Sequence, residues 1–169
     1  SMRVGFDEPL KVGEAFDLGR LGQLSLHQGE RIRSFTDASL PSVPGQLAHR
    51  IDVARRRVLL DDGDAALDAA LALGRPLPHP WPGLGLSHRF RAGDAVLGLA
   101  GILDRSTNDR GSDEPLRVRP VAELPPPIFV AANPAPAAPP DVGGRLAIAS
   151  FNVSNYFATI DTTASNATG

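Results

Sequence analysis

The chain has 169 residues, and its 17 Lys and Arg against 19 Asp and Glu give a net charge of −2. This balance excludes the strongly basic character of a dedicated nucleic-acid-binding domain, although arginines can still gather locally. The absence of cysteine excludes disulfide bonds and thiolate metal sites. No apolar run is long enough to span a bilayer and no signal peptide is recognisable, so no membrane partner is expected.

Residues 1–123 consist mainly of short alternating apolar runs separated by turn residues, a pattern that predicts β-strands. The predicted strands cover residues 3–6, 11–18, 22–26, 57–60, 94–103 and 116–121. Gly98 and Gly101 suggest bends within the run at 94–103. Pro120 predicts that the last strand lies at a sheet edge, because proline cannot donate to a ladder. The pattern predicts five or six strands.

Residues 64–73 (DAALDAALAL) break this pattern and favour a helix, with Asp64 as its N-cap and Gly74 at its end. The prolines that follow, within residues 76–82, predict an extended loop that carries Trp81. These elements together predict an all-β domain over residues 1–123, a small OB-fold-like barrel with one short helix.

Residues 124–145 differ in composition, because residues 124–142 hold seven of the sixteen prolines. Such a segment is typical of a semi-rigid, extended linker. After it, residues 146–156 (LAIASFNVSNY) form a hydrophobic run that predicts a strand. We expect residues 146–169 to be the beginning of a second, truncated domain.

Residues 143–157 (GGRLAIASFNVSNYF) resemble the opening strand of DNase I-like nucleases of the endonuclease/exonuclease/phosphatase superfamily, above all the secreted bacterial multi-domain members. Ser154 departs from the leucine usual there. The resemblance extends back over most of the chain, to the segment that precedes the catalytic domain in that subgroup. The matching pieces are residues 16–26, a turn at Pro44-Gly45, residues 60–63 and residues 91–104.

The resemblance implies that Asn152 matches the asparagine of the first catalytic strand, which helps to orient the metal-bound phosphate or the attacking water. An amide suits this role because it offers an acceptor and two donors without adding negative charge beside a phosphate. The implied parent is an extracellular or periplasmic hydrolase of phosphodiesters that uses Mg²⁺, Mn²⁺ or Ca²⁺. Its metal ligand and general acid/base residues lie beyond this chain. The chain alone is therefore expected to be inactive and to hold no metal.

Arginines at 55–57 form the densest basic run, and further arginines would track a phosphate backbone with them if all converge on one barrel face. The candidate nucleic-acid-binding residues are Arg55, Arg57, Arg31, Arg33, Arg89 and Arg91, with Trp81 as an exposed stacking platform. Phe6, Phe16 and Phe90 are expected in the core. If residues 55–57 lie in a strand, at most two of these arginines point the same way. The alternative interpretation is a solvated arginine face with no ligand.

The sequence therefore predicts a non-catalytic accessory module of a secreted, metal-dependent nuclease, with DNA or RNA and the parent's own catalytic domain as partners. One alternative is a structural spacer or a module that binds a surface polymer. Another is a parent that acts on a different phosphoester. The four histidines never stand at metal-ligand spacing, so no metal site is predicted within this chain.

Overall fold

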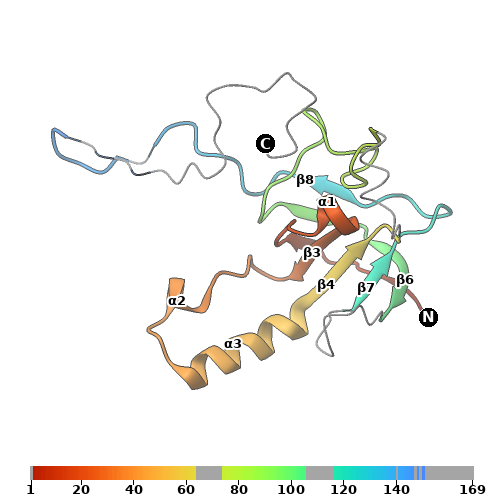
Figure 1. Ribbon diagram of the computed structural model, residues 1–169, viewed down its shortest axis with the longest axis horizontal. Coiled ribbons are helices and arrows are strands. Elements are labelled where there is room, and N and C mark those ends of the chain that lie inside the picture. The colour runs from red at the N-terminus through yellow and green to blue at the C-terminus, as the bar shows by residue number, and fades with distance from the viewer. Residues whose placement is uncertain are drawn as a thin grey trace, which may run out of the picture. The chain divides into compact units, whose positions relative to one another are not determined.

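The computed structural model describes residues 2–63, 74–105, 116–139, 141–146, 148 and 150 (Figure 1). The chain divides into two compact units, Ser1–Ala135 and Pro136–Gly169. The described strands and helices all belong to the first unit. The predicted helix at 64–73 and most of the predicted strand at 146–156, including Asn152, lie outside the described residues. No helix in the described ranges is long and apolar enough to cross a bilayer.

Within the described residues, eight strands form one mixed sheet. They are β1 (Met2–Gly5), β2 (Leu10–Val12), β3 (Gln23–Gln28), β4 (Arg57–Asp61), β5 (Ala95–Leu97), β6 (Ala100–Asp104), β7 (Arg117–Arg119) and β8 (Ile128–Val130). The order is β1-β6-β7-β4-β3-β2-β5-β8. Only β4 and β7 pair in parallel. Three short helices, α1 (Leu18–Leu21), α2 (Phe35–Ala38) and α3 (Val43–Arg56), accompany the sheet.

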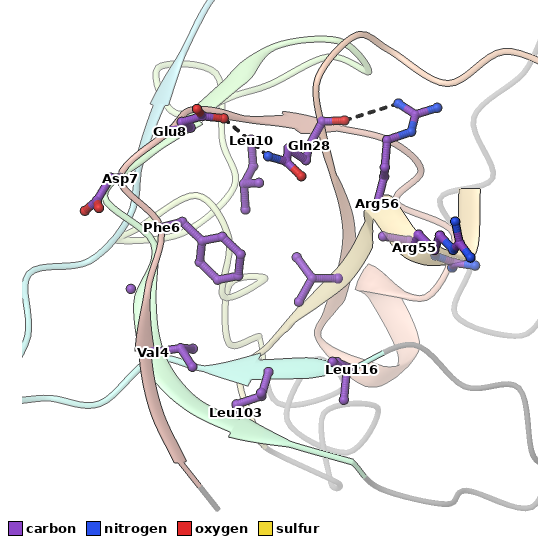
Figure 2. A pocket seen from close by; sticks show the side chains of 13 residues that line it. Val4, Phe6, Asp7, Glu8, Leu10, Gln28, Arg55, Arg56, Leu103 and Leu116 are labelled. Atoms are coloured by element: carbon purple, nitrogen blue, oxygen red, sulfur yellow. Dashed lines mark hydrogen bonds between the residues drawn. The ribbon is translucent and has the colours of Figure 1, made fainter. Parts of the chain in front are cut away.

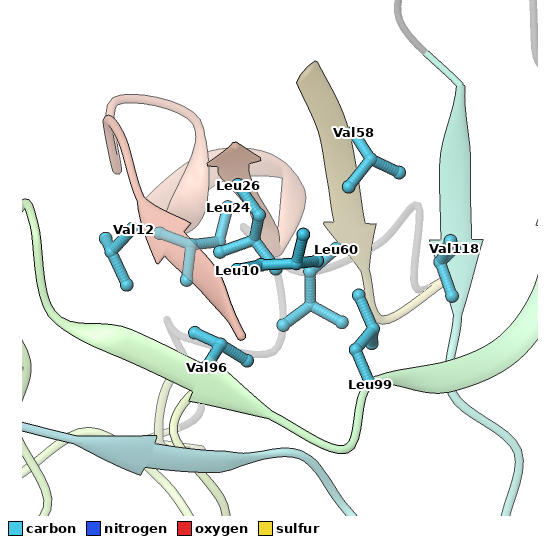
Figure 3. Packing of buried hydrophobic residues seen from close by; sticks show 9 residues of the cluster. All are labelled: Leu10, Val12, Leu24, Leu26, Val58, Leu60, Val96, Leu99 and Val118. Carbon is cyan, nitrogen blue, oxygen red and sulfur yellow. The ribbon is translucent and has the colours of Figure 1, made fainter. Parts of the chain in front are cut away.

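The sheet curls around one apolar core (Figure 3). Alternation along the paired strands β3 and β4 sets Leu24 opposite Leu60 and Leu26 opposite Val58 in this core. The buried cluster comprises Leu10, Val12, Leu24, Leu26, Val58, Leu60, Val96, Leu99 and Val118, and the edge strands β1 and β8 add the half-buried Val4 and Phe129. The expectation of a mostly β structure is confirmed. The sheet is not closed into a barrel, because β1 and β8 stand at opposite ends of the order and each pairs with one strand.

Helix α3 corrects two predictions. The turn predicted at Pro44-Gly45 is wrong, since both residues lie in the first turn of this helix. Ser42 is its N-cap, and the Ser42 hydroxyl accepts a hydrogen bond from the Gly45 N–H at 3.1 Å. Proline is favoured in a first helical turn because its missing N–H is not needed there. The prediction of one short helix is also wrong, because the described residues hold three.

The strand predictions hold in place but not in length. The run at 94–103 is two strands, because Gly98 takes the left-handed φ of 64° and breaks it between β5 and β6. The run at 11–18 is a strand only as far as Val12, and the buried Leu18 begins α1. The edge position predicted from Pro120 is wrong, since β7 lies between β6 and β4. β7 ends at Arg119, so the proline stands just past the ladder.

Strand β8 falls inside the segment predicted as a linker. Its three residues pair with β5, which sets Phe129 opposite Val96. The buried carboxylate of Asp94 fixes the chain just after it, because Asp94 Oδ1 accepts hydrogen bonds from the N–H groups of Ala132 and Asn133, both at 2.9 Å. The compact unit Ser1–Ala135 therefore includes β8 and the residues that Asp94 holds after it.

Candidate functional site

The described residues form a groove of about 450 Å³ where β1, the turn after it and the junction of α3 with β4 come together. The groove has an apolar floor, made by Val4, Phe6, Leu10, Val58, Leu103 and Leu116. Figure 2 shows Phe6 and Leu10 pointing into the space between the two walls. The volume falls in the range of roughly 300–1,000 Å³ that is typical of small-ligand sites.

The two walls of the groove carry opposite charge. Asp7 and Glu8, in the turn between β1 and β2, stand on one wall. Arg55 and Arg56, at the end of α3, stand on the other (Figure 2). Such a groove complements a ligand with an anionic side, an apolar middle and a hydrogen-bond-donating side.

Gln28, the last residue of β3, connects the walls. Its side-chain Nε2 donates a hydrogen bond to Glu8 Oε2 at 3.3 Å, and its backbone carbonyl oxygen accepts one from Arg56 Nη1 at 3.2 Å. Arg56 also pairs with Asp52 one helical turn earlier, where Arg56 Nε donates to Asp52 Oδ2 at 2.9 Å. The hydrogen bond from Arg56 is the largest cause of the lowered pKa of the Asp52 carboxyl. Arg56 is thus held in place by neighbours on both sides.

Arg57 also lines the groove, but its guanidinium is engaged elsewhere. Arg57 Nε donates to the Ser25 hydroxyl at 3.0 Å, and Arg57 Nη2 pairs with Glu14 at 3.2 Å. Arg55 is exposed, and the described residues offer it no hydrogen bond or ion pair. The arrangement corrects the strand interpretation of residues 55–57, because Arg55 and Arg56 end a helix and Arg57 begins a strand. Of the three, Arg55 is the arginine best placed to meet an anion.

Sequence reasoning missed several residues of the groove, namely Asp7, Glu8, Gln28 and Phe6. Phe6 was expected in the core, and the structure places it half-buried, packed against the core cluster and lining the groove. The chain offers a weak signal for Phe6, because this residue directly follows the edge strand β1 and precedes the polar Asp7-Glu8-Pro9 turn. An aromatic ring at a strand end beside a turn is often accessible on one face.

The other predicted binding residues do not line the groove. Arg31 and Arg91 are both exposed, and Arg31 Cδ lies 3.4 Å from the position that a Cβ on Gly93 would take. Arg33 and Arg89 are exposed in loops. Trp81 is 67% exposed in its proline-rich loop, as predicted from the sequence.

A second polar cluster lies buried on the opposite face of β3, β4 and β7. Asp61 is at its centre: its Oδ2 accepts hydrogen bonds from Gln23 Nε2 and Arg117 Nη1, each at 3.2 Å. Its other oxygen accepts the Gly63 N–H at 2.8 Å. His79, from the proline-rich loop, is buried near Asp61. Burial lowers the pKa of His79 to about 4, against the opposing effect of Asp61. The hydrogen bonds of Asp61 join β4 to β3, to β7 and to the backbone at Gly63.

His27 is a second buried histidine on the same face. It sits between Lys11 and Arg57 in the strand register, and its ring fills the space above Gly13. Burial, and next the charges of Arg57 and Arg56, lower the pKa of His27 to about 4. At neutral pH the imidazole is therefore uncharged, so it adds nothing to the positive charge beside it.

No group of three or more His, Asp or Glu side chains that could hold a metal ion occurs among the residues that the structure describes. Comparisons of the chain with protein-family models, with curated proteins and with solved structures find no match. The chemistry of the groove is thus the evidence from which a function can be argued.

Proposed function

We propose that the first unit is a non-catalytic module that binds single-stranded nucleic acid in the groove. The observation that supports this proposal best is that one groove is lined both by a half-buried aromatic ring, Phe6, and by an exposed arginine, Arg55, for which the described part of the chain supplies no hydrogen bond or ion pair. A base stacks on an aromatic face with a gain of about 1–3 kcal/mol, and arginine is suited to a backbone phosphate. Bases in a duplex are not open to such stacking, so a single strand is the expected ligand.

The shape of the groove favours one strand over two. A volume of about 450 Å³ between two walls is enough for one or two nucleotides of a single strand. It is too small to take in a DNA duplex. The curled sheet with a ligand site beside its strand ends is also what we expect of an OB-fold-like module, and we propose that finer assignment together with the function. Five further residues have a secondary role in this proposal, because they would contact the strand beyond the groove as an outer track. They are Arg31, Arg33, Arg89, Arg91 and Trp81.

The proposal also uses the resemblance of residues 143–157 to secreted DNase I-like nucleases, which implies a catalytic domain after this module. In the full-length protein, the module would hold a strand for a metal-dependent phosphodiesterase domain in which Asn152 takes part. This chain's described residues supply no step of the hydrolysis. We accordingly assign them no catalytic role and no metal.

A spacer role is the second candidate, and a specific observation favours it. Arg56 and Arg57 are engaged by Asp52, Glu14 and other neighbours within the fold, so their charge is partly neutralised. The anchoring of the chain after β8 by Asp94 would likewise serve a domain whose task is to orient its neighbour. The two candidates differ in whether the isolated module binds nucleic acid at all.

The deciding experiment is a fluorescence-anisotropy titration with short single- and double-stranded oligonucleotides at roughly 50 and 200 mM salt, where phosphate contacts weaken steeply. The variant Arg55→Ala is expected to weaken single-strand binding and to reduce the salt slope by about 1. Arg20→Ala, an exposed arginine in α1 that lies outside both the groove and the outer track, is the matched control. Phe6→Leu keeps the site apolar but removes the ring, and it is expected to weaken binding roughly tenfold. No binding by the unmodified protein at low salt would leave the spacer.

A further inference from the structure

We propose that the groove selects bases that carry an exocyclic amino group, so that cytosine binds better than thymine, and that Glu8 is the residue that reads this group. The inference rests on the proposed function and names the part of the ligand that the acidic wall would meet. Its basis is the position of Glu8 across the apolar floor from Arg55, with Gln28 beside it.

The chemistry of Glu8 restricts what can face it. An ionised carboxylate only accepts hydrogen bonds, and its two oxygens offer about four acceptor sites. Gln28 Nε2 occupies one of these sites at 3.3 Å. The remaining sites require a donor, which the N4 amino group of cytosine provides and the O4 carbonyl of thymine does not. Thymine offers the carboxylate a single donor, its N3–H, and that group stands between the O4 and O2 carbonyl oxygens, which the carboxylate repels.

The charge of the two walls orients the strand. A phosphate would be repelled by Asp7 and Glu8 and attracted by Arg55, so the sugar-phosphate backbone is expected on the arginine wall. The base then lies over Phe6 with its hydrogen-bonding edge toward the acidic wall. This orientation follows from the same groove geometry whichever base is bound, and Glu8 then distinguishes among the bases.

Glu8 and Asp7 differ in direction, although they are neighbours in the chain. Figure 2 shows the Glu8 carboxylate directed toward Gln28 and the Asp7 carboxylate directed away from it, on the outer side of the turn. Replacement of either residue by alanine removes one negative charge from the same wall. Only the replacement of Glu8 removes the acceptor that faces the groove, so Asp7→Ala is a closely matched control for Glu8→Ala.

The test compares oligo(dC) with oligo(dT) of equal length by anisotropy, on the unmodified protein and on both variants. A single charge-assisted hydrogen bond predicts roughly a tenfold to hundredfold preference for oligo(dC). Glu8→Ala is expected to abolish the preference while binding to oligo(dT) stays equal or becomes tighter, and Asp7→Ala is expected to keep it. Thermal unfolding of each variant verifies that the fold is intact.

The outcomes separate the two proposals. Binding of both oligonucleotides with equal affinity, or a preference that survives Glu8→Ala, would overturn the role of Glu8 and leave the nucleic-acid module standing. A preference lost equally in both variants would show that wall charge, and not the acceptor of Glu8, sets the selectivity. Absence of binding to either oligonucleotide would overturn the proposed function itself, and this inference with it.

Discussion

Asp94 Oδ1 accepts the Asn133 N–H at 2.9 Å, and a second hydrogen bond joins the same two chain segments, since Asn133 Nδ2 donates to the carbonyl oxygen of Ala92, two residues before Asp94, at 2.7 Å. The other carboxylate oxygen of Asp94 accepts the Arg91 N–H at 2.7 Å. One buried side chain therefore closes the turn that opens β5 and holds the chain that leaves β8. Burial alone would raise the pKa of Asp94, but the backbone hydrogen bonds and the charge of Arg91 outweigh it, and the pKa is lowered.

Asp94→Ala is expected to destabilise the module by about 1–3 kcal/mol, because it leaves the N–H groups of Ala132, Asn133 and Arg91 without their acceptor. Urea unfolding measures the change. Asp141→Ala serves as the control, since Asp141 makes a similar bond to the Gly143 N–H on an exposed segment. Equal stability of the two variants would mean that the Asp94 contacts do not hold β8 in solution.

The buried histidines make stability depend on pH. His27 and His79 each have a pKa of about 4 in the folded protein against an ordinary value of 6.5. Between pH 6.5 and 4 the unfolded chain therefore binds more protons, so the free energy of unfolding falls as the pH is lowered through this window and is constant above it. The loss reaches about 3 kcal/mol per histidine near pH 4.

Unfolding in urea at several pH values between about 7 and 4.5, above the range where most carboxylates titrate, measures this dependence. His27→Gln and His79→Gln are each expected to flatten the curve. A curve that stays steep in the double variant would show that other groups carry the dependence.

The buried pair of Asp61 and Arg117 couples β4 to β7, the one parallel pair of the sheet. Asp61→Leu is expected to cost about 3–5 kcal/mol, because it removes the carboxylate from beside a buried guanidinium. The double variant Asp61→Leu with Arg117→Met is expected to be more stable than Asp61→Leu alone, since it removes the buried charge as well. Chemical unfolding of the two single variants and the double variant gives the coupling energy. Strict additivity would contradict the interaction.

Gly101 is needed for the close approach of β6 to β7. A Cβ at this position would overlap the carbonyl oxygen of Arg119, which is backbone and cannot move aside as a side chain can. Gly101→Ala is therefore expected to destabilise the module by about 1–3 kcal/mol. Gly19→Ala in α1 is the control, because nothing lies within 4 Å of its added methyl group and alanine favours a helix. Thermal unfolding of both variants should separate them clearly.

The alternating runs predicted most strands in place because the inner face of this sheet is apolar and the period of two is visible in short segments such as residues 22–26. Helix α3 was missed although its signals are local: Ser42 as cap and Pro44 in the first turn. Strand β8 could not be recognised, because three residues between prolines gain their strand conformation only from pairing with β5.

The groove could not be predicted from the sequence, for a different reason. Its walls come from residues 7–8 and 55–56, which meet only through the order of the sheet and the contact of Arg56 with Gln28. The sequence predicts residues 55–57 as binding candidates because of their charge alone, yet it does not reveal that Arg57 is paired with Glu14. It also does not show that Phe6 faces a groove and not only the core.

The attachment of β8 to the sheet shortens the part of the predicted linker that is free to extend. A proline-rich chain covers about 3.1 Å per residue when it is extended, so a linker over residues 124–145 would reach roughly 70 Å. With residues up to Ala135 held in the compact unit, the part up to residue 145 reaches only roughly 30 Å from its anchor. A partner domain would then sample a much smaller volume, at a higher effective concentration near the sheet. Because Asp94 holds the chain just after β8, it sets the point from which the predicted linker would be free to move.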